Sequence, residues 1–262
     1  MEFRGKVVWV TGASAGIGEA LARELAGQGA RLVLSARNEV ALHRVAAACA
    51  PAKTLVLPLD LAAPDTFKAA VAAVQAHFGR LDVLINNGGI SQRSLALETS
   101  LDVDRRLMEV DYFGPVALSK AVLPAMLSRG SGHIVVISSL VGKFGTPYRS
   151  AYSAAKHALH GFFDSLRAEL HGTGVGVSII CPGFIHTGVS VNALTGDGRA
   201  LGQMDEATAN GLAPAEFARR AVRALAWERD EVTIGGRETW GVLLKRLAPG
   251  LFARVLRRAR VR

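Results

Sequence analysis

The sequence has few cysteines, few aromatic residues and no long apolar run. Its 262 residues include two cysteines, and aromatic residues make up 6% of the chain. Cys49 and Cys181 stand too far apart in the sequence to suggest a metal site, and two thiols cannot build the multiple disulfides of a small secreted domain. The first residues lead into a short strand-like run that Gly12 interrupts, so neither a secretion signal nor a membrane span is indicated there. We therefore expect a cytoplasmic protein with reduced cysteines.

Most of the positive charge lies at the C-terminal end. The net charge is +9 at pH 7. Residues 245–262 hold seven lysines and arginines and no acidic residue, so the charge of the remaining residues is nearly balanced. The net positive charge of the chain therefore comes mainly from residues 245–262, the basic tail. Binding of nucleic acid is not predicted, because no recognition module accompanies the charge.

Short apolar runs alternate with longer segments of helical period, which is the pattern of β-α-β units and a parallel sheet. Strands are predicted near residues 6–11, 32–35, 54–57, 81–86, 132–138, 175–181 and 232–234. Helices are predicted over residues 16–28, 39–49, 64–77, 101–129, 150–171 and 214–227. The sequence thus predicts one α/β domain over residues 1–262, with a doubly wound (Rossmann) fold and a seven-stranded parallel sheet. The irregular segment at residues 187–213 is predicted to be a substrate lid.

A glycine-rich turn joins the first predicted strand to the first predicted helix. Its sequence is Thr11-Gly12-Ala13-Ser14-Ala15-Gly16-Ile17-Gly18. Free backbone N–H groups and the positive end of a helix dipole meet at such a turn, and they suit the pyrophosphate of a dinucleotide. The spacing GxxxGxG also occurs in ordinary tight turns, so the segment alone leaves both interpretations open.

The end of the second predicted strand indicates which nucleotide would bind. In dinucleotide sites an acid near this position binds the ribose hydroxyls, whereas an arginine accommodates a 2′-phosphate. Here the strand ends in Ser35-Ala36-Arg37-Asn38, which contains no acid. This favours NADP(H) over NAD(H), although a solvated surface cation is the commoner role of a single arginine.

With these motifs, the chain resembles the short-chain dehydrogenase/reductase family over nearly its whole length. Asp60 and Leu61 match the family's residues beside the adenine, and Asn86-Asn87-Gly88-Gly89 stands where the family has Asn-Asn-Ala-Gly. Pro182-Gly183-Phe184-Ile185-His186-Thr187 is similar to the family's proline-glycine segment, whose Ile and Thr contact the nicotinamide. The stretch from Val110 to Arg149 further resembles the subgroup of the 11β-hydroxysteroid dehydrogenases and related orphan reductases.

The glycine-rich turn, the strand end and the resemblance together predict the residues that bind the cofactor. These residues are Gly12, Ser14, Gly16, Ile17, Gly18, Arg37, Asp60, Leu61, Asn87, Gly88, Tyr152, Lys156, Pro182, Gly183, Ile185 and Thr187. The resemblance also implies a homo-oligomer, either a dimer or a tetramer.

Tyr152 and Lys156 stand four residues apart in a predicted helix, so both lie on one face. A neighbouring cation favours the phenolate form of a tyrosine, whose unperturbed pKa is about 10. On its own, such a pair is more often a partly exposed surface contact. Ser139 lies thirteen residues before Tyr152, which is the offset at which the family places its catalytic serine. This offset and the cofactor motifs favour a catalytic set of Ser139, Tyr152 and Lys156.

The resemblance implies hydride transfer between the nicotinamide and a carbonyl or secondary alcohol carbon. In this mechanism Ser139 hydrogen-bonds the substrate oxygen and Tyr152 carries the proton. Lys156 lowers the pKa of Tyr152 and holds the nicotinamide ribose. The fourth catalytic member of the family is an Asn that orders a water behind the Lys, and Asp111 occupies its position here. This difference leaves the proton relay in question, but not the hydride step.

The predicted function is that of an NADP(H)-dependent carbonyl reductase or alcohol dehydrogenase. Its substrate would be a moderately apolar ketone, either steroid-like or lipid-like. The alternative is a nucleotide-binding sensor or interaction protein of the same fold, in which Asp111 marks lost turnover and the basic tail binds the partner. The intact Ser139, Tyr152 and Lys156 argue against this alternative.

No metal site is predicted. His157, His160 and Asp164 share one face of a predicted helix, but surface histidines are far commoner than histidine ligands. No further ligand converges with them in the sequence, and the chemistry that the resemblance implies requires no metal.

The basic tail also carries an apolar stripe. Leu251, Phe252, Val255 and Leu256 recur at helical spacing beside arginines, and a Pro-Gly pair at residues 249–250 separates them from the preceding chain. One interpretation is a helix that lies on an anionic membrane surface. The other is that the stripe packs on the protein's own body or on a second subunit. The sequence leaves these two interpretations open.

Overall fold

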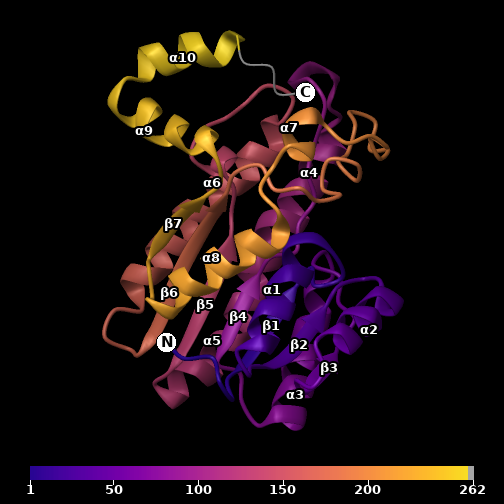
Figure 1. The fold of residues 1–262 in the computed structure, drawn as a ribbon, viewed down its shortest axis with the longest axis vertical. Coiled ribbons are helices and arrows are strands. Elements are labelled where there is room, and N and C mark those ends of the chain that lie inside the picture. The colour runs from indigo at the N-terminus through magenta and orange to yellow at the C-terminus, as the bar shows by residue number, and fades with distance from the viewer. Residues whose placement is uncertain (259–262) are drawn as a thin grey trace.

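The computed structural model describes residues 1–258 and contains a seven-stranded parallel sheet (Figure 1). Its strands are β1 (Val7–Thr11), β2 (Arg31–Ser35), β3 (Thr54–Val56), β4 (Val83–Asn86), β5 (Gly132–Ile137), β6 (Val175–Pro182) and β7 (Glu231–Ile234). Their spatial order is β3-β2-β1-β4-β5-β6-β7, and each neighbouring pair is parallel. The predicted doubly wound α/β fold is therefore confirmed.

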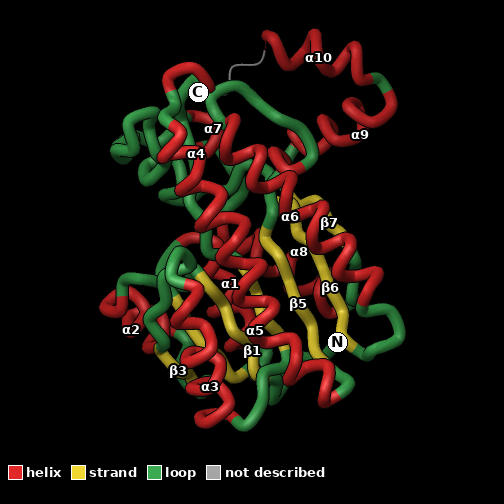
Figure 2. The backbone as a smooth tube through the Cα atoms, turned by 180° about the vertical axis from the view of Figure 1, so that it is seen from behind, coloured by secondary structure: helices red, strands yellow, loops and turns green. Residues whose placement is uncertain are grey.

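Helices cover both faces of the sheet (Figure 2). They are α1 (Gly16–Gly27), α2 (Glu39–Ala48), α3 (Phe67–Phe78), α4 (Leu101–Met108), α5 (Gly114–Arg129), α6 (Ser150–Glu169), α7 (Glu206–Ala209), α8 (Pro214–Ala226), α9 (Trp240–Leu247) and α10 (Pro249–Arg258). Alternate side chains of β1 enter opposite layers. Val8 and Val10 pack with α1, α2 and α8, whereas Val7 and Trp9 pack with α3, α5 and α6. Both faces of β1 are buried, which explains why its central positions are continuously apolar.

The order of the strands creates a crevice at one edge of the sheet. β1 pairs with β2 on one side and with β4 on the other, and α1 after β1 packs on the opposite face from α5 between β4 and β5. Ligands of doubly wound folds bind outside the carboxyl ends of the strands at such a switch point. The motif-bearing segments after β1, β4, β5 and β6 all begin at this edge.

The single helix predicted over residues 101–129 is interrupted in its middle. A π-helical turn over Glu109–Phe113 separates α4 from α5. Pro115 explains the interruption, because it has no N–H to donate to the carbonyl of Asp111, the acceptor four residues earlier in an α-helix. π-helical turns are frequent at functional sites, and this one leaves the side chain of Asp111 fully buried.

The segment at residues 187–213 has little regular structure and is fastened to the rest of the chain. It contains α7, and isolated bridges join Leu194 to Gln92 and Leu212 to Ile185. Ser190 at one end of the segment is buried. Whether the segment moves as a lid stays a prediction.

The apolar stripe of the tail is divided between the protein's body and its surface. α9 and α10 form an arm at one end of the molecule (Figure 1). Phe252 is buried against Leu140 and Phe144, and the two phenylalanine rings lie 4.9 Å apart. Leu251 and Val255 of the same helix are exposed. The structure therefore supports packing on the body for one side of α10 and leaves the other side uncovered.

Part of the predicted basic tail lies outside the described structure, namely residues 259–262 and the side chain of Arg258. Among the helices of residues 1–258, none has both the length and the apolar character needed to cross a bilayer.

Candidate active site

A cavity of about 1900 Å³ opens at the carboxyl edge of the sheet. The predicted site residues on its walls are Gly12, Ser14, Gly16, Ile17, Arg37, Asp60, Leu61, Asn87, Gly88, Asp111, Ser139, Tyr152, Lys156, Pro182, Gly183, Ile185 and Thr187. Gly18 is the exception, because it is buried in α1, where a Cβ atom would lie 2.1 Å from the carbonyl oxygen of Gly12. Gly18 therefore allows the turn and the helix to pack closely, and it does not line the cavity.

Hydrogen bonds from the end of β4 hold the glycine-rich turn in place. The side-chain amide of Asn87 donates to the carbonyl of Thr11 at 2.9 Å. The hydroxyl of Thr11 accepts from the backbone N–H groups of Asn87 and Gly88, each at 3.0 Å. Gly12 has a φ of 64°, and a Cβ atom there would lie 2.7 Å from the Cα of Gly88, so this approach requires glycine. The turn and the segment after β4 are thus joined at the nucleotide end of the cavity.

The N-terminus of α1 is arranged to receive an anion. Its N-cap residue is Ala15, which provides no side-chain acceptor for the first backbone N–H groups of the helix. Gly16 follows with a φ of 58°, and the Thr187 side chain lies beside it. Unsatisfied N–H groups and the helix dipole attract a phosphate at such a position. These residues fit the pyrophosphate of a dinucleotide.

Arg37 is exposed at the nucleotide end of the cavity and has no carboxylate partner within residues 1–258. The nearby Arg44, in contrast, is already paired with Glu19 at 2.7 Å. Asn38 caps α2 by accepting a hydrogen bond from the N–H of Ala41 at 3.0 Å, which fixes the chain beside Arg37. Arg37 is therefore a cation that a ligand in this part of the cavity can reach.

The end of β5 and the helix α6 bring the predicted catalytic side chains together. The buried Nζ of Lys156 donates to the carbonyl of Ile137 at 3.3 Å and lies 5.7 Å from the centre of the Tyr152 ring. The hydroxyl oxygen of Ser139 accepts from the backbone N–H of Val141 at 3.3 Å. The three side chains share one cavity with the glycine-rich turn.

The π-helical turn places the carboxylate of Asp111 against Lys156. Its Oδ2 lies 3.3 Å from Nζ of Lys156, and its Oδ1 accepts from the N–H of Ile90 at 2.7 Å. Burial lowers the pKa of Lys156, but the carboxylate of Asp111 and the phenol of Tyr152 outweigh burial and hold this pKa above its usual value. The residue that departs from the family's Asn is thus the counter-ion of the lysine.

This geometry predicts how Asp111→Asn changes the pH dependence of turnover. We expect activity to survive, because the substitution introduces the Asn that the family has at this position. The loss of a negative charge beside Lys156 should move the apparent pKa in the pH profile of kcat to lower pH. The measurement is the kcat profile of wild type, Asp111→Asn and the exposed control Asp65→Asn. Superimposable profiles for all three would remove Asp111 from the relay.

Gln92 is a positioning residue that the sequence analysis missed. It is fully buried, and its side-chain oxygen accepts from the N–H groups of Ala151 at 2.9 Å and Tyr152 at 3.4 Å. Its amide nitrogen donates to the hydroxyl of Thr99 at 2.7 Å. Gln92 therefore caps the N-terminus of α6, the helix that carries Tyr152 and Lys156. No local signal marks this role, because the capped helix begins far along the sequence.

A buried ion cluster joins the segment after β4 to the predicted lid. Asp205, the N-cap of α7, contacts Arg93 at 2.8 Å and Arg149 at 3.5 Å, and all three are buried. Burial raises the pKa of Asp205, but hydrogen bonds from Thr208 and Arg93 hold it below its usual value. Burial and the neighbouring Arg93 lower the pKa of Arg149 to about 10. Arg93 and Arg149 also line the cavity, and no motif in the sequence marks them as site residues.

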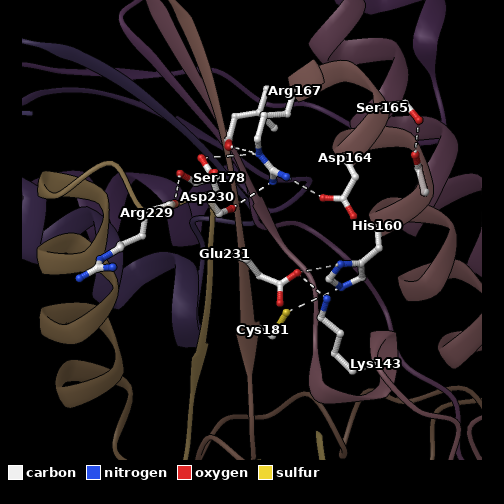
Figure 3. Close-up of polar contacts among 12 residues, drawn as sticks. Lys143, His160, Asp164, Ser165, Arg167, Ser178, Cys181, Arg229, Asp230 and Glu231 are labelled. Atoms are coloured by element: carbon white, nitrogen blue, oxygen red, sulfur yellow. Dashed lines mark hydrogen bonds and ion pairs between the residues drawn. The ribbon is translucent and has the colours of Figure 1, made fainter. Parts of the chain in front are cut away.

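A polar network behind the end of β5 reaches from α6 to β7 (Figure 3). The ring Nε2 of His160 lies 3.0 Å from the hydroxyl of Ser138 and 3.7 Å from the sulfur of Cys181. Nδ1 of His160 lies 3.5 Å from the carboxylate of Glu231, which also pairs with Lys143. The network holds the side chain of Ser138, directly before the predicted catalytic serine.

His157, His160 and Cys181 each have a polar contact within this part of the protein. His157 contacts the carbonyl of Ser153 at 2.8 Å, whereas His160 faces Ser138, so the two do not converge on one point. No group of three metal-type ligands occurs in the part of the chain that the structure describes. Burial raises the pKa of Cys181 to about 12, which leaves its thiol protonated and unreactive at neutral pH.

Comparison with known proteins agrees with this geometry. Residues 6–197 match the short chain dehydrogenase family. The chain is 47% identical to dehydrogenase/reductase SDR family member 7B of Bos taurus, over 97% of this chain and 81% of that protein. It is 45% identical to dehydrogenase/reductase SDR family protein 7-like of Drosophila melanogaster, over 95% of this chain and 78% of that protein.

Solved structures of similar fold include complexes with both nicotinamide nucleotides. A short-chain dehydrogenase/reductase from Burkholderia phymatum in complex with NAD has a TM-score of 0.86 and 27% identity, and the match covers 96% of each chain. A metagenomic short-chain oxidoreductase in complex with NADP has a TM-score of 0.73 and 32% identity, over 89% of this chain and 98% of that chain. The chain therefore belongs to the short-chain dehydrogenase/reductase family of oxidoreductases.

Proposed function

We propose that this protein transfers a hydride between NADP(H) and the carbon of a carbonyl or secondary alcohol. The observation that carries the proposal is that Ser139, Tyr152 and Lys156 line the same cavity as the glycine-rich turn. The nicotinamide would supply the hydride, and the protein would supply position and the proton. A carbonyl that accepts a hydride becomes an alkoxide, which needs a proton donor and hydrogen-bonding groups at its oxygen.

The residues of the cavity divide this task. Tyr152 gives the proton to the forming alkoxide, or removes it from the alcohol in the reverse direction, and Ser139 orients the substrate oxygen. Lys156 binds the nicotinamide ribose and keeps a positive charge beside the phenol. Asp111 holds that charge in place at 3.3 Å, and Gln92 fixes the start of the helix that carries the pair.

The preference for NADP(H) is supported by the end of β2. Ala36 and Arg37 both line the cavity, no acidic residue stands at this strand end, and Arg37 is exposed. A 2′-phosphate would pair with Arg37, whereas the ribose hydroxyls of NAD(H) would lack the usual carboxylate acceptor. The structures of similar proteins contain either nucleotide, so the preference rests on these residues.

Two substitutions test this preference. Ala36→Asp should shift the preference toward NAD(H), because a carboxylate accepts from ribose hydroxyls and repels a 2′-phosphate. Arg37→Ala should weaken NADPH binding about tenfold and leave NADH nearly unchanged, as expected for the loss of one charge-assisted contact. The measurement is Kd for both nucleotides at matched salt, with the exposed Lys68→Ala as the control. Equal affinities of the wild-type protein for NADH and NADPH would overturn the assignment.

A moderately apolar substrate is supported by the apolar side chains on the walls of the cavity. Ile90 and Leu194 pack with Tyr152, and Val141 donates its N–H to Ser139. Phe144 and Leu244 line the same cavity. Such walls favour a steroid-like or lipid-like ketone over a small polar one. The test is a panel of ketones and alcohols with both nucleotides. Turnover of any apolar member supports the proposal, whereas tight nucleotide binding without turnover would support the sensor alternative.

A further inference from the structure

α9 and α10 expose an apolar row that the body of the protein does not cover. On their inner side, Leu244, Phe252 and Leu256 pack against Leu140 and Phe144. Beside this contact the two helices carry exposed apolar residues, namely Trp240, Leu243, Leu247, Leu251 and Val255. Leu247 is 80% exposed and Trp240 is 70% exposed. We call these five residues the outer row. Clustered exposed apolar side chains with polar neighbours mark interaction sites.

Exposed cations accompany the outer row. Arg246, Arg254 and Arg257 are exposed, and none of them forms an ion pair within residues 1–258. Residues 240–262 contain no Asp or Glu that could neutralise them. The arm is thus an amphipathic pair of helices with a basic surface and large apolar side chains, including a tryptophan. This composition matches the requirements of an anionic lipid surface, which takes apolar side chains at the acyl boundary and cations at the headgroups.

A second copy of the chain suits the arm less well. A two-fold interface brings the same patch of each copy together, so the arginines of one arm would meet a patch that carries the same arginines and no acid. Like charges at an interface are unfavourable without intervening acids, and the arm has none. A nucleic acid would neutralise the arginines but would leave the outer row without an apolar partner.

The outer row also forms part of the rim of the cavity. Trp240, Leu243, Leu247 and Val255 line the cavity that contains Tyr152. A surface that covers the outer row would therefore lie at one opening of the active site.

We propose that the outer row and its flanking arginines dock the protein on an anionic membrane surface, peripherally and reversibly. Docking does not depend on turnover, because the side chains that would meet the lipid are exposed on the arm and carry no chemical step. The attraction between basic residues and an anionic bilayer is screened by salt. Binding should therefore weaken as the salt concentration rises.

The test is sedimentation of the full-length protein with vesicles of phosphatidylcholine alone or of phosphatidylcholine with phosphatidylserine. Two double variants remove the two parts of the surface, Leu247→Asp/Leu251→Asp for the outer row and Arg254→Glu/Arg257→Glu for the charge. Matched controls are Val40→Asp on α2 and Lys53→Glu/Lys68→Glu, with Lys53 directly before β3 and Lys68 on α3; β3 and α3 lie at the opposite end of the molecule (Figure 1). Substitution is preferable to deletion of α10, because deletion would expose Leu140 and Phe144.

Wild type and the controls should sediment with the anionic vesicles at low salt and not with the neutral ones. Both arm variants should bind at least about tenfold more weakly while keeping the thermal unfolding midpoint of wild type, since the replaced side chains are exposed. Failure of wild type to sediment with anionic vesicles would overturn the proposal. So would arm variants that bind as well as the controls, or arm variants that instead dissociate an oligomer seen by light scattering, because the arm would then contact a second copy.

Discussion

Replacing Tyr152 by Phe should lower kcat about 10²–10⁴-fold and leave nucleotide binding close to that of wild type. The ring that lies beside Lys156 is kept, and only the hydroxyl that carries the proton is lost. The measurement combines steady-state kcat with the Kd of NADPH. Tyr112→Phe is the matched control, because Tyr112 packs against Phe113 and Phe162 and does not line the cavity.

Two results would contradict this prediction. If Tyr152→Phe keeps a sizeable part of kcat, another group carries the proton and the proposed mechanism fails. If Tyr152→Phe loses NADPH binding as well, the low activity reports a disturbed site, and the phenol has not been shown to be the proton carrier.

Lys156→Met should abolish turnover, weaken nucleotide binding and destabilise the fold. The substitution leaves the fully buried carboxylate of Asp111 without its cation at 3.3 Å. Removing one partner of a buried ion pair typically costs about 3–5 kcal/mol of stability. The exposed Lys68→Met serves as the control and should change neither activity nor stability.

The double variant Asp111→Asn/Lys156→Met separates the catalytic effect from the structural one. It removes both charges, so its free energy of unfolding should recover much of the loss seen in Lys156→Met, whereas its turnover should not recover. Denaturant unfolding and kcat measure the two quantities. If the double variant is no more stable than Lys156→Met, the instability of Lys156→Met does not come from an unpaired carboxylate at Asp111. Nucleotide affinity unchanged in Lys156→Met would remove the lysine from the ribose site.

The sheet was predictable from the sequence because its signals are local. Buried parallel strands consist of short β-branched apolar runs, and the helices that cover them have apolar residues that recur every three to four positions. Each element can therefore be recognised from its own residues. The glycine-rich turn and the Tyr152/Lys156 spacing are also local. The interruption near Asp111 has a local cause in Pro115, yet the apolar periodicity continues through it and suggested one helix.

The support of the site was not predictable, because it depends on contacts between distant segments. Gln92 caps a helix that begins some sixty residues later, and Arg93 meets Asp205 from the segment after β6. A lone polar residue in an irregular segment carries no signal for such a partner. The apolar stripe of the tail shows the same limit, since only the fold determines that Phe252 packs inward while Leu251 remains exposed.

Hydride transfer from NADPH to a carbonyl carbon is tested most directly by following a deuterium atom from the nicotinamide to the substrate. Wild-type protein and Tyr152→Phe would each be given NADPH with deuterium at the transferable C4 position and an apolar ketone that the panel shows to be turned over. Wild type should place deuterium on the new carbinol carbon, and Tyr152→Phe should form almost none of this product. Oxidation of the nucleotide without deuterium in the alcohol, or an equal yield from both proteins, would contradict hydride transfer with Tyr152 as the proton carrier.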